Sequence, residues 1–104
     1  MNQKKFNVIA KTNKELETEL AFYIATSRAE GAEIIKISVP DESKRFLSAA
    51  ERILRTFKKA GKVQLFEMAE KLSSDSAAAW YLRNKYPQHV AEWEAEKLSL
   101  IVKI

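Results

Sequence analysis

Short apolar runs rich in β-branched residues alternate along this chain with longer segments whose apolar residues recur at helical spacing. The strand-like runs cover residues 6–10, 34–39, 63–66 and 98–104, and the last of them alternates most regularly. Short length, alternation with a period of two and β-branched content are typical of strands. Strands that alternate with helices favour βαβ units, so the pattern predicts a mixed α/β fold whose first two strands are parallel and joined by a right-handed crossover.

Two of the helical segments have clear starts or ends. Thr12 and Glu15 stand at the two ends of a capping box, and Gly31 suits the left-handed residue that ends the following helix. A second helix is expected after Pro40, and Gly61 ends it. Its apolar stripe consists of Phe46, Leu47, Ala50, Ile53, Leu54 and Phe57.

The C-terminal third of the chain predicts less regular structure before the last strand. A helix is expected over 74–85, with the serines of 73–76 as candidates for its N-cap, and Pro87 ends it. A short helical turn over 88–97 is expected to carry Val90 and Trp93. The resulting order β-α-β-α-β-α-β predicts one domain over residues 1–104, built as a two-layer sandwich with one sheet covered by helices.

Composition excludes several classes of function. The 104 residues include no cysteine and one histidine, which excludes disulfide scaffolds, thiolate metal sites, cysteine nucleophiles and multi-histidine metal centres. Two glycines leave no Gly-rich phosphate loop. No apolar run approaches the roughly 20 residues of a membrane span, and the N-terminal segment lacks the apolar stretch of a signal peptide. We therefore expect a cytoplasmic protein with no membrane association, no cofactor and no metal.

Positive charge is concentrated in one segment. Residues 44–62 hold seven basic residues and one acidic residue, a net charge of +6, whereas residues 63–96 carry a net charge of −3. The spacing of the basic residues places several of them along one exposed stripe of the second helix. The candidate nucleic-acid-binding residues are Lys44, Arg45, Arg52, Arg55, Lys59 and Lys62. The alternative is a solvated helix face that only keeps the protein soluble.

Other chemistry-bearing residues favour structural interpretations. His89 has only Glu92 near it in sequence, so a surface histidine is expected rather than a catalytic one. The four aromatic residues of 80–93 could stack on bases, but more often such residues pack beneath a helix. Among them Tyr81 and Tyr86 are expected to be the more exposed. The alternating glutamates of 92–96 indicate an acidic loop rather than a metal site.

The order of these features resembles the small MutS-related (Smr) domain, in the short, free-standing form found in bacteria. The similarity lies in residues 27–31 followed by 34–37, in the turn over 58–63, and in 84–87 followed by 100–102. The resemblance implies a β-α-β-α-β-β core like that of the C-terminal domain of translation initiation factor 3. It also implies nucleic-acid binding and, in some members, endonuclease activity.

The motifs that carry chemistry in that family are missing here. Where its His-Gly-x-Gly loop would follow the second strand, residues 38–45 read Ser-Val-Pro-Asp-Glu-Ser-Lys-Arg. Where its Leu-Asp-x-His-Gly motif would stand, residues 8–12 read Val-Ile-Ala-Lys-Thr. Pro40 removes an amide donor, and Asp41 and Glu42 add negative charge, so this loop should repel a phosphodiester. We therefore carry over no catalytic residue.

Three functional hypotheses follow. The first is a non-catalytic Smr-like domain that binds RNA or DNA weakly through the basic second helix. The second is a protein-interaction or self-association module that uses the C-terminal strand, provided that this strand lies at a sheet edge. The third, ranked last, is a metal-dependent nuclease using Asp41 and Glu42. The sequence alone names no nucleic-acid target, protein partner or oligomeric state.

Overall fold

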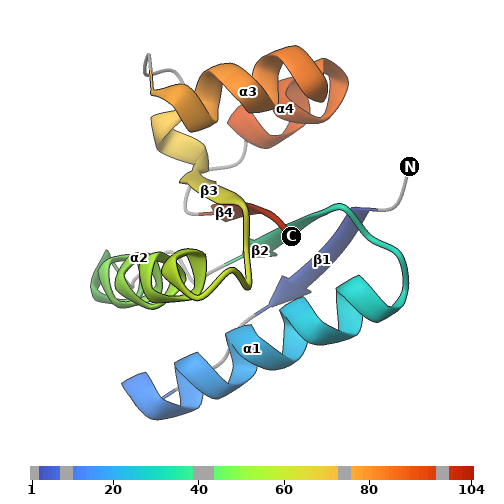
Figure 1. The fold of residues 1–104 in the computed structure, drawn as a ribbon. Coiled ribbons are helices and arrows are strands. Elements are labelled where there is room, and N and C mark those ends of the chain that lie inside the picture. Colours follow the sequence, from blue (N-terminus) through green and yellow to red (C-terminus); the bar gives the residue numbers. More distant parts are fainter. Residues whose placement is uncertain (1–2, 8–10, 39–43, 73–75, 96–98) are drawn as a thin grey trace.

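The computed structural model describes residues 3–7, 11–38, 44–72, 76–95 and 99–104. Its class is mixed α/β, as the sequence predicts (Figure 1). The elements in chain order are β1 (Gln3–Asn7), α1 (Asn13–Ala29), β2 (Ile34–Ser38), α2 (Lys44–Lys59), β3 (Leu65–Met68), the 3₁₀ helix η1 (Ala69–Lys71), α3 (Ala77–Lys85), α4 (Pro87–Glu94) and β4 (Ser99–Lys103).

Several element boundaries differ from the prediction. The first described strand covers Gln3–Asn7, and residues 8–10 lie outside the described part of the chain. The third strand begins at Leu65, two residues later than expected. The predicted short helical turn is a helix of eight residues that begins at Pro87, because the fixed φ of proline suits the first turn of a helix. Pro87 therefore separates two helices instead of only ending one.

The four strands form one sheet in the order β1-β2-β4-β3. β1 and β2 are parallel, as expected, and β4 runs antiparallel to both of its neighbours, β2 and β3. Leu100 of β4 is opposite Ile37 on one side and Met68 on the other. The C-terminal strand is therefore interior, so its expected edge position is wrong and the self-association hypothesis loses the observation on which it depended. The chain leaves the sheet through η1, α3 and α4 and returns between two strands, a long-range placement that local sequence does not encode.

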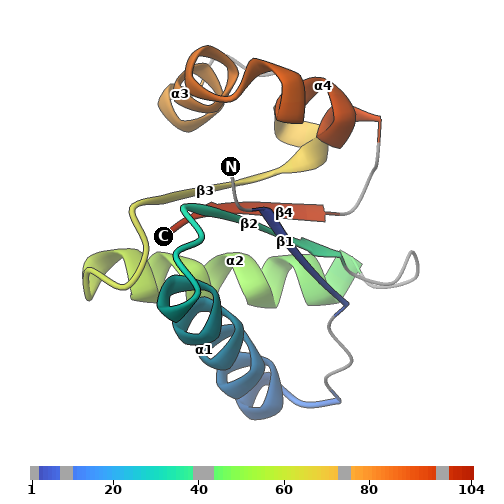
Figure 2. The ribbon, with the colours of Figure 1, turned by 90° about the vertical axis from the view of Figure 1, so that its right-hand side faces the viewer.

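Helices cover both faces of the sheet, so the predicted two-layer sandwich is also wrong. Figure 2 shows α1 and α2 on one side of the sheet and α3 and α4 on the other. Each face has its own core: Ile35, Ile37 and Val102 pack with α1 and α2, whereas Ile34 and Ile101 pack with η1, α3 and α4. Strands covered on both faces are apolar along most of their length, and the run Ile-Ile-Lys-Ile of β2 is a signal of this kind.

The predicted helix caps are present. The hydroxyl of Thr12 accepts a hydrogen bond from the backbone N–H of Glu15 at 3.1 Å, and the Glu15 carboxylate accepts one from the N–H of Lys11 at 2.9 Å. Gly31 and Gly61 have φ values of 82° and 76°, a left-handed conformation that costs glycine little. These two glycines end the helices that position the basic segment.

In the α3–α4 hairpin, the burial of two aromatic residues differs from the expectation. Ala79, Leu82 and Tyr86 follow helical spacing onto the sheet, and Tyr86 is only 4% exposed. Its hydroxyl donates to the Glu33 carboxylate at 3.2 Å, and burial, more than this bond, raises the pKa of Tyr86. Trp80 lies on the opposite side of α3 and is 65% exposed. The expectation that Tyr86 is exposed is therefore wrong.

Candidate nucleic-acid interface

α2 is strongly amphipathic, and its buried side faces the sheet. Leu47, Ala50, Leu54 and Phe57 are buried, while Phe46 and Ile53 are partly buried at the margins of this stripe. In a helix of 3.6 residues per turn, the side opposite this stripe is occupied by positions 45, 48, 52, 55 and 59. The core packing of α2 therefore turns the basic positions toward solvent, as the sequence predicts.

The structure places the predicted basic residues as follows. Arg52, Arg55 and Lys59 are exposed on α2, and Lys62 is exposed just beyond its C-terminal end. Lys44 and Arg45 begin α2, but their side chains lie outside the described part of the chain. Among the described residues, neither Arg52 nor Lys59 forms an ion pair. We call the described outward residues Arg52, Arg55 and Lys59 the α2 basic face.

One acidic residue of the same helix partly neutralises this face. The Glu51 carboxylate lies 2.9 Å from Arg55 Nη2 and 3.4 Å from Nζ of Lys71. The two described pairings of acids from 63–96 lie elsewhere: Glu94 pairs with Arg83 at 3.1 Å, and Glu67 accepts a hydrogen bond from Ser76 at 2.6 Å. Among the described residues, no carboxylate of the acidic segment thus forms an ion pair with the α2 basic face.

A further cation joins the C-terminal end of α2 from another element. The Arg28 guanidinium, in the last turn of α1, donates to the backbone carbonyl of Lys62. The Lys62 ammonium in turn lies 5.0 Å from the centre of the Phe57 ring. Sequence reasoning missed Arg28, because its contact with Lys62 joins residues 34 positions apart and depends on α1 and α2 covering the same face of the sheet (Figure 2).

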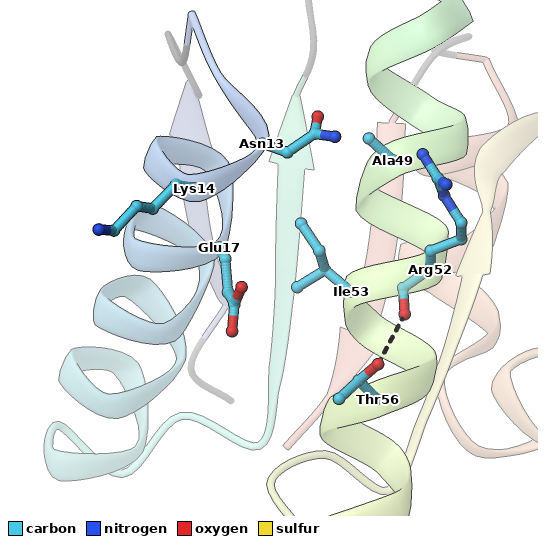
Figure 3. A pocket seen from close by; sticks show the side chains of 7 residues that line it. All are labelled: Asn13, Lys14, Glu17, Ala49, Arg52, Ile53 and Thr56. Carbon is cyan, nitrogen blue, oxygen red and sulfur yellow. Dashed lines mark hydrogen bonds between the residues drawn. The ribbon is translucent and has the colours of Figure 1, made fainter.

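A groove of about 340 Å³ separates the N-terminal half of α1 from α2. Figure 3 shows Ile53 between the two helices, the Asn13 side chain directed toward α2, and Arg52 on the α2 side. Glu17 also lines the groove, whereas Lys14 points away from α2. The hydroxyl of Thr56 is occupied, since it donates to the Arg52 carbonyl at 3.2 Å. The groove therefore offers an arginine and an amide on its walls, next to one carboxylate.

The other candidate residues do not assemble a catalytic site among the described residues. His89 is half-buried and stacks on Trp93, with ring centres 5.4 Å apart. Ser76 caps α3 by accepting from the N–H of Ala79 at 3.1 Å, the role expected for this serine cluster. Asp41 and Glu42, proposed for a metal-dependent nuclease, lie outside the described residues.

Neither a metal-binding cluster in the described segments nor a match to a known family indicates a function for this chain. Those segments contain no group of three or more histidine, cysteine, aspartate or glutamate residues placed to hold a metal ion. No helix in them combines the length and the apolar character that crossing a membrane requires. No family model, curated protein or solved structure matches the chain. A functional interpretation therefore depends on the geometry of α2 and its surroundings.

Proposed function

We propose that this chain binds the phosphate backbone of RNA or DNA through the α2 basic face and catalyses no reaction on it. The observation that carries the proposal is that Arg52 and Lys59 are exposed and make no ion pair among the described residues. Cations that are not tied to carboxylates can exchange their counterions for phosphates without breaking a contact in the protein.

The geometry supports a backbone contact rather than base reading. Positions 52 and 59 are seven residues apart, roughly 10 Å along the helix axis, so they lie on one line. α2 lies flat against the sheet beside α1 (Figure 2), so its outward side chains meet a surface rather than enter a groove. Contacts of this kind position a phosphate chain but carry no sequence information.

The expected affinity is weak and depends on salt. A few phosphate contacts without base contacts fall in the range of non-specific binding, with Kd on the order of 10⁻⁴ to 10⁻⁶ M. Each lysine or arginine that contacts a duplex phosphate adds about 0.9 to the slope of log K against log salt. A solvated face without a nucleic-acid partner would give no saturable binding even at low salt.

A fluorescence-anisotropy titration tests this proposal. A labelled RNA duplex and a DNA duplex are titrated at about 50 and about 200 mM salt. We expect Arg52→Gln combined with Lys59→Gln to lower the salt slope by up to about 1.8. The matched control removes the exposed charges of Lys11 and Lys85, which lie off α2, and should leave the slope near that of the wild type. No binding at low salt, or equal effects of the two double variants, would contradict the proposal.

We also propose that the relationship to the Smr family is one of architecture without the nuclease motifs. The first five elements follow the order that the resemblance implies, and η1, α3 and α4 stand between the last two strands. On this proposal, the purified protein leaves RNA and DNA intact with magnesium or manganese. Cleavage that Asp41→Ala abolishes would favour the nuclease hypothesis instead.

A further inference from the structure

Another cavity lies between the C-terminal halves of α1 and α2. Its volume is about 270 Å³, and among the described residues no carboxylate lines it. Positions 21, 24, 25 and 28 recur at helical spacing, so they share the side of α1 that faces α2. The lining residues are Ala21, Ile24, Ala25, Arg28, Phe57 and Lys62.

The floor of this cavity is apolar and already well packed. Ile24 and Phe57 are each only 3% exposed and belong to the core under α1 and α2. The two alanines of α1 leave the space above this floor open, because their methyl groups are too short to fill the gap between the helices. The apolar part of a ligand can therefore enter without displacing a core side chain.

Two cations border the cavity where both helices end. The Arg28 guanidinium donates to the backbone carbonyl of Lys62, which holds the last turn of α1 against the segment that follows α2. The Lys62 ammonium lies 5.0 Å from the centre of the Phe57 ring, at the margin of the apolar floor. Among the described residues, neither cation forms an ion pair. The bond from Arg28 to Lys62 also uses only one of the five N–H donors of the guanidinium.

The acids that follow α1 in sequence do not pair with these two cations. Glu30 is the C-cap of α1 and does not line the cavity. Glu33 accepts a hydrogen bond from the Tyr86 hydroxyl at 3.2 Å, and Tyr86 belongs to the core on the other face of the sheet. An apolar floor bordered by cations without carboxylate partners is complementary to a ligand that combines an apolar body with a negative charge.

We propose that this cavity binds a small, free carboxylate whose apolar body lies on Ile24 and Phe57 and whose charge lies between Arg28 and Lys62. The volume limits the size of the ligand, since pockets for drug-sized molecules have volumes of about 300 to 1,000 Å³. An inorganic anion or a backbone phosphate would leave the apolar floor uncovered. The proposal does not depend on nucleic-acid binding, because no residue of the α2 basic face lines the cavity.

The first test titrates the full-length, isotopically labelled protein with phenylpropionate and follows it by NMR. We expect saturable amide shifts in residues 21–28 and 57–62, with Kd on the order of 0.1–1 mM for a ligand of about ten heavy atoms. The neutral phenylpropionamide should bind about tenfold more weakly, because it forms no charge-assisted hydrogen bond to either cation. Acetate, which lacks the apolar body, should also bind about tenfold more weakly. Equal binding by the amide, by acetate or by inorganic phosphate, or no saturable shifts, would overturn the proposal.

The second test changes the protein. Ala25→Leu fills the cavity with a residue of high helix propensity, so the protein should stay folded and phenylpropionate should bind about tenfold more weakly or not at all. Lys62→Gln should weaken the binding of phenylpropionate severalfold and leave that of phenylpropionamide unchanged. The matched control is Ala91→Leu, at an exposed position of α4 on the other side of the sheet, and it should bind both compounds as the wild type does. Undiminished binding by Ala25→Leu, or an equal loss in Ala91→Leu, would contradict the proposal.

Discussion

Replacing Glu51 by glutamine removes the carboxylate that Arg55 and Lys71 share. The Arg55 and Lys71 side chains are 67% and 47% exposed and that of Glu51 is 21% exposed, so solvent screens both ion pairs from the side of the cations. Exposed pairs of this kind contribute up to about 1 kcal/mol, so we expect Glu51→Gln to lower the free energy of unfolding by no more than about 1 kcal/mol. The helix should remain folded, because glutamine has nearly the helix propensity of glutamate.

The same substitution should strengthen nucleic-acid binding. A phosphate roughly 10 Å from Glu51 in water is repelled by about 0.4 kcal/mol, which corresponds to about twofold in Kd. If the freed Arg55 also contacts a phosphate, the salt slope rises by about 0.9. Anisotropy titrations at low salt compare this variant with Glu92→Gln, which removes an exposed charge from α4 on the other side of the sheet. Equal changes in Kd for the two variants, or weaker binding by Glu51→Gln, would refute the reasoning.

Three further predictions concern stability. Ser76→Ala removes the cap of α3 and leaves the buried Glu67 carboxylate without the hydrogen bond from Ser76. Urea denaturation should show that the free energy of unfolding falls by about 1–3 kcal/mol. The control, Ser48→Ala at an exposed position of α2, should lower it by less than about 0.5 kcal/mol. Gly61→Ala should lower the free energy of unfolding by about 1 kcal/mol, because the φ of 76° is unfavourable for a residue with a Cβ. The added Cβ itself has space, since no atom lies within 4 Å of it. Gly61→Asn should lower the free energy of unfolding less, because asparagine tolerates this conformation better than alanine. Burial raises the pKa of Tyr86 above 10.0, so the phenol proton is lost at lower pH in the unfolded chain than in the folded one. The free energy of unfolding should therefore fall as pH rises past 10.0. Tyr86→Phe should make this fall less steep.

Sequence reasoning succeeded where the information is local. The Thr12 and Glu15 pair and the two glycines have structural consequences within a few residues, so the bounds of α1 and the end of α2 could be predicted. The outward position of Arg52, Arg55 and Lys59 follows from the apolar stripe of the same helix. The fixed period of a helix relates the two sides directly.

Sequence reasoning failed where position depends on distant segments. Whether β4 lies at an edge or in the interior depends on which strands it joins after 30 residues outside the sheet. The apolar run of β4 is compatible with either position. The packing of α3 and α4 on the second face of the sheet buries Tyr86 and leaves Trp80 exposed, the reverse of the expectation from sequence. The hydrogen bond from Arg28 to the Lys62 carbonyl at the end of α2 is also a long-range contact.

The most direct measurement of the central claim is an NMR titration of the isotopically labelled protein with an RNA duplex and a DNA duplex at low salt. The account predicts side-chain and amide shifts centred on Arg52, Arg55 and Lys59, with those of α4 unchanged, and loss of these shifts as salt is raised. Shifts centred on α3 and α4 around the exposed Trp80, or no saturable shifts with either duplex, would contradict it.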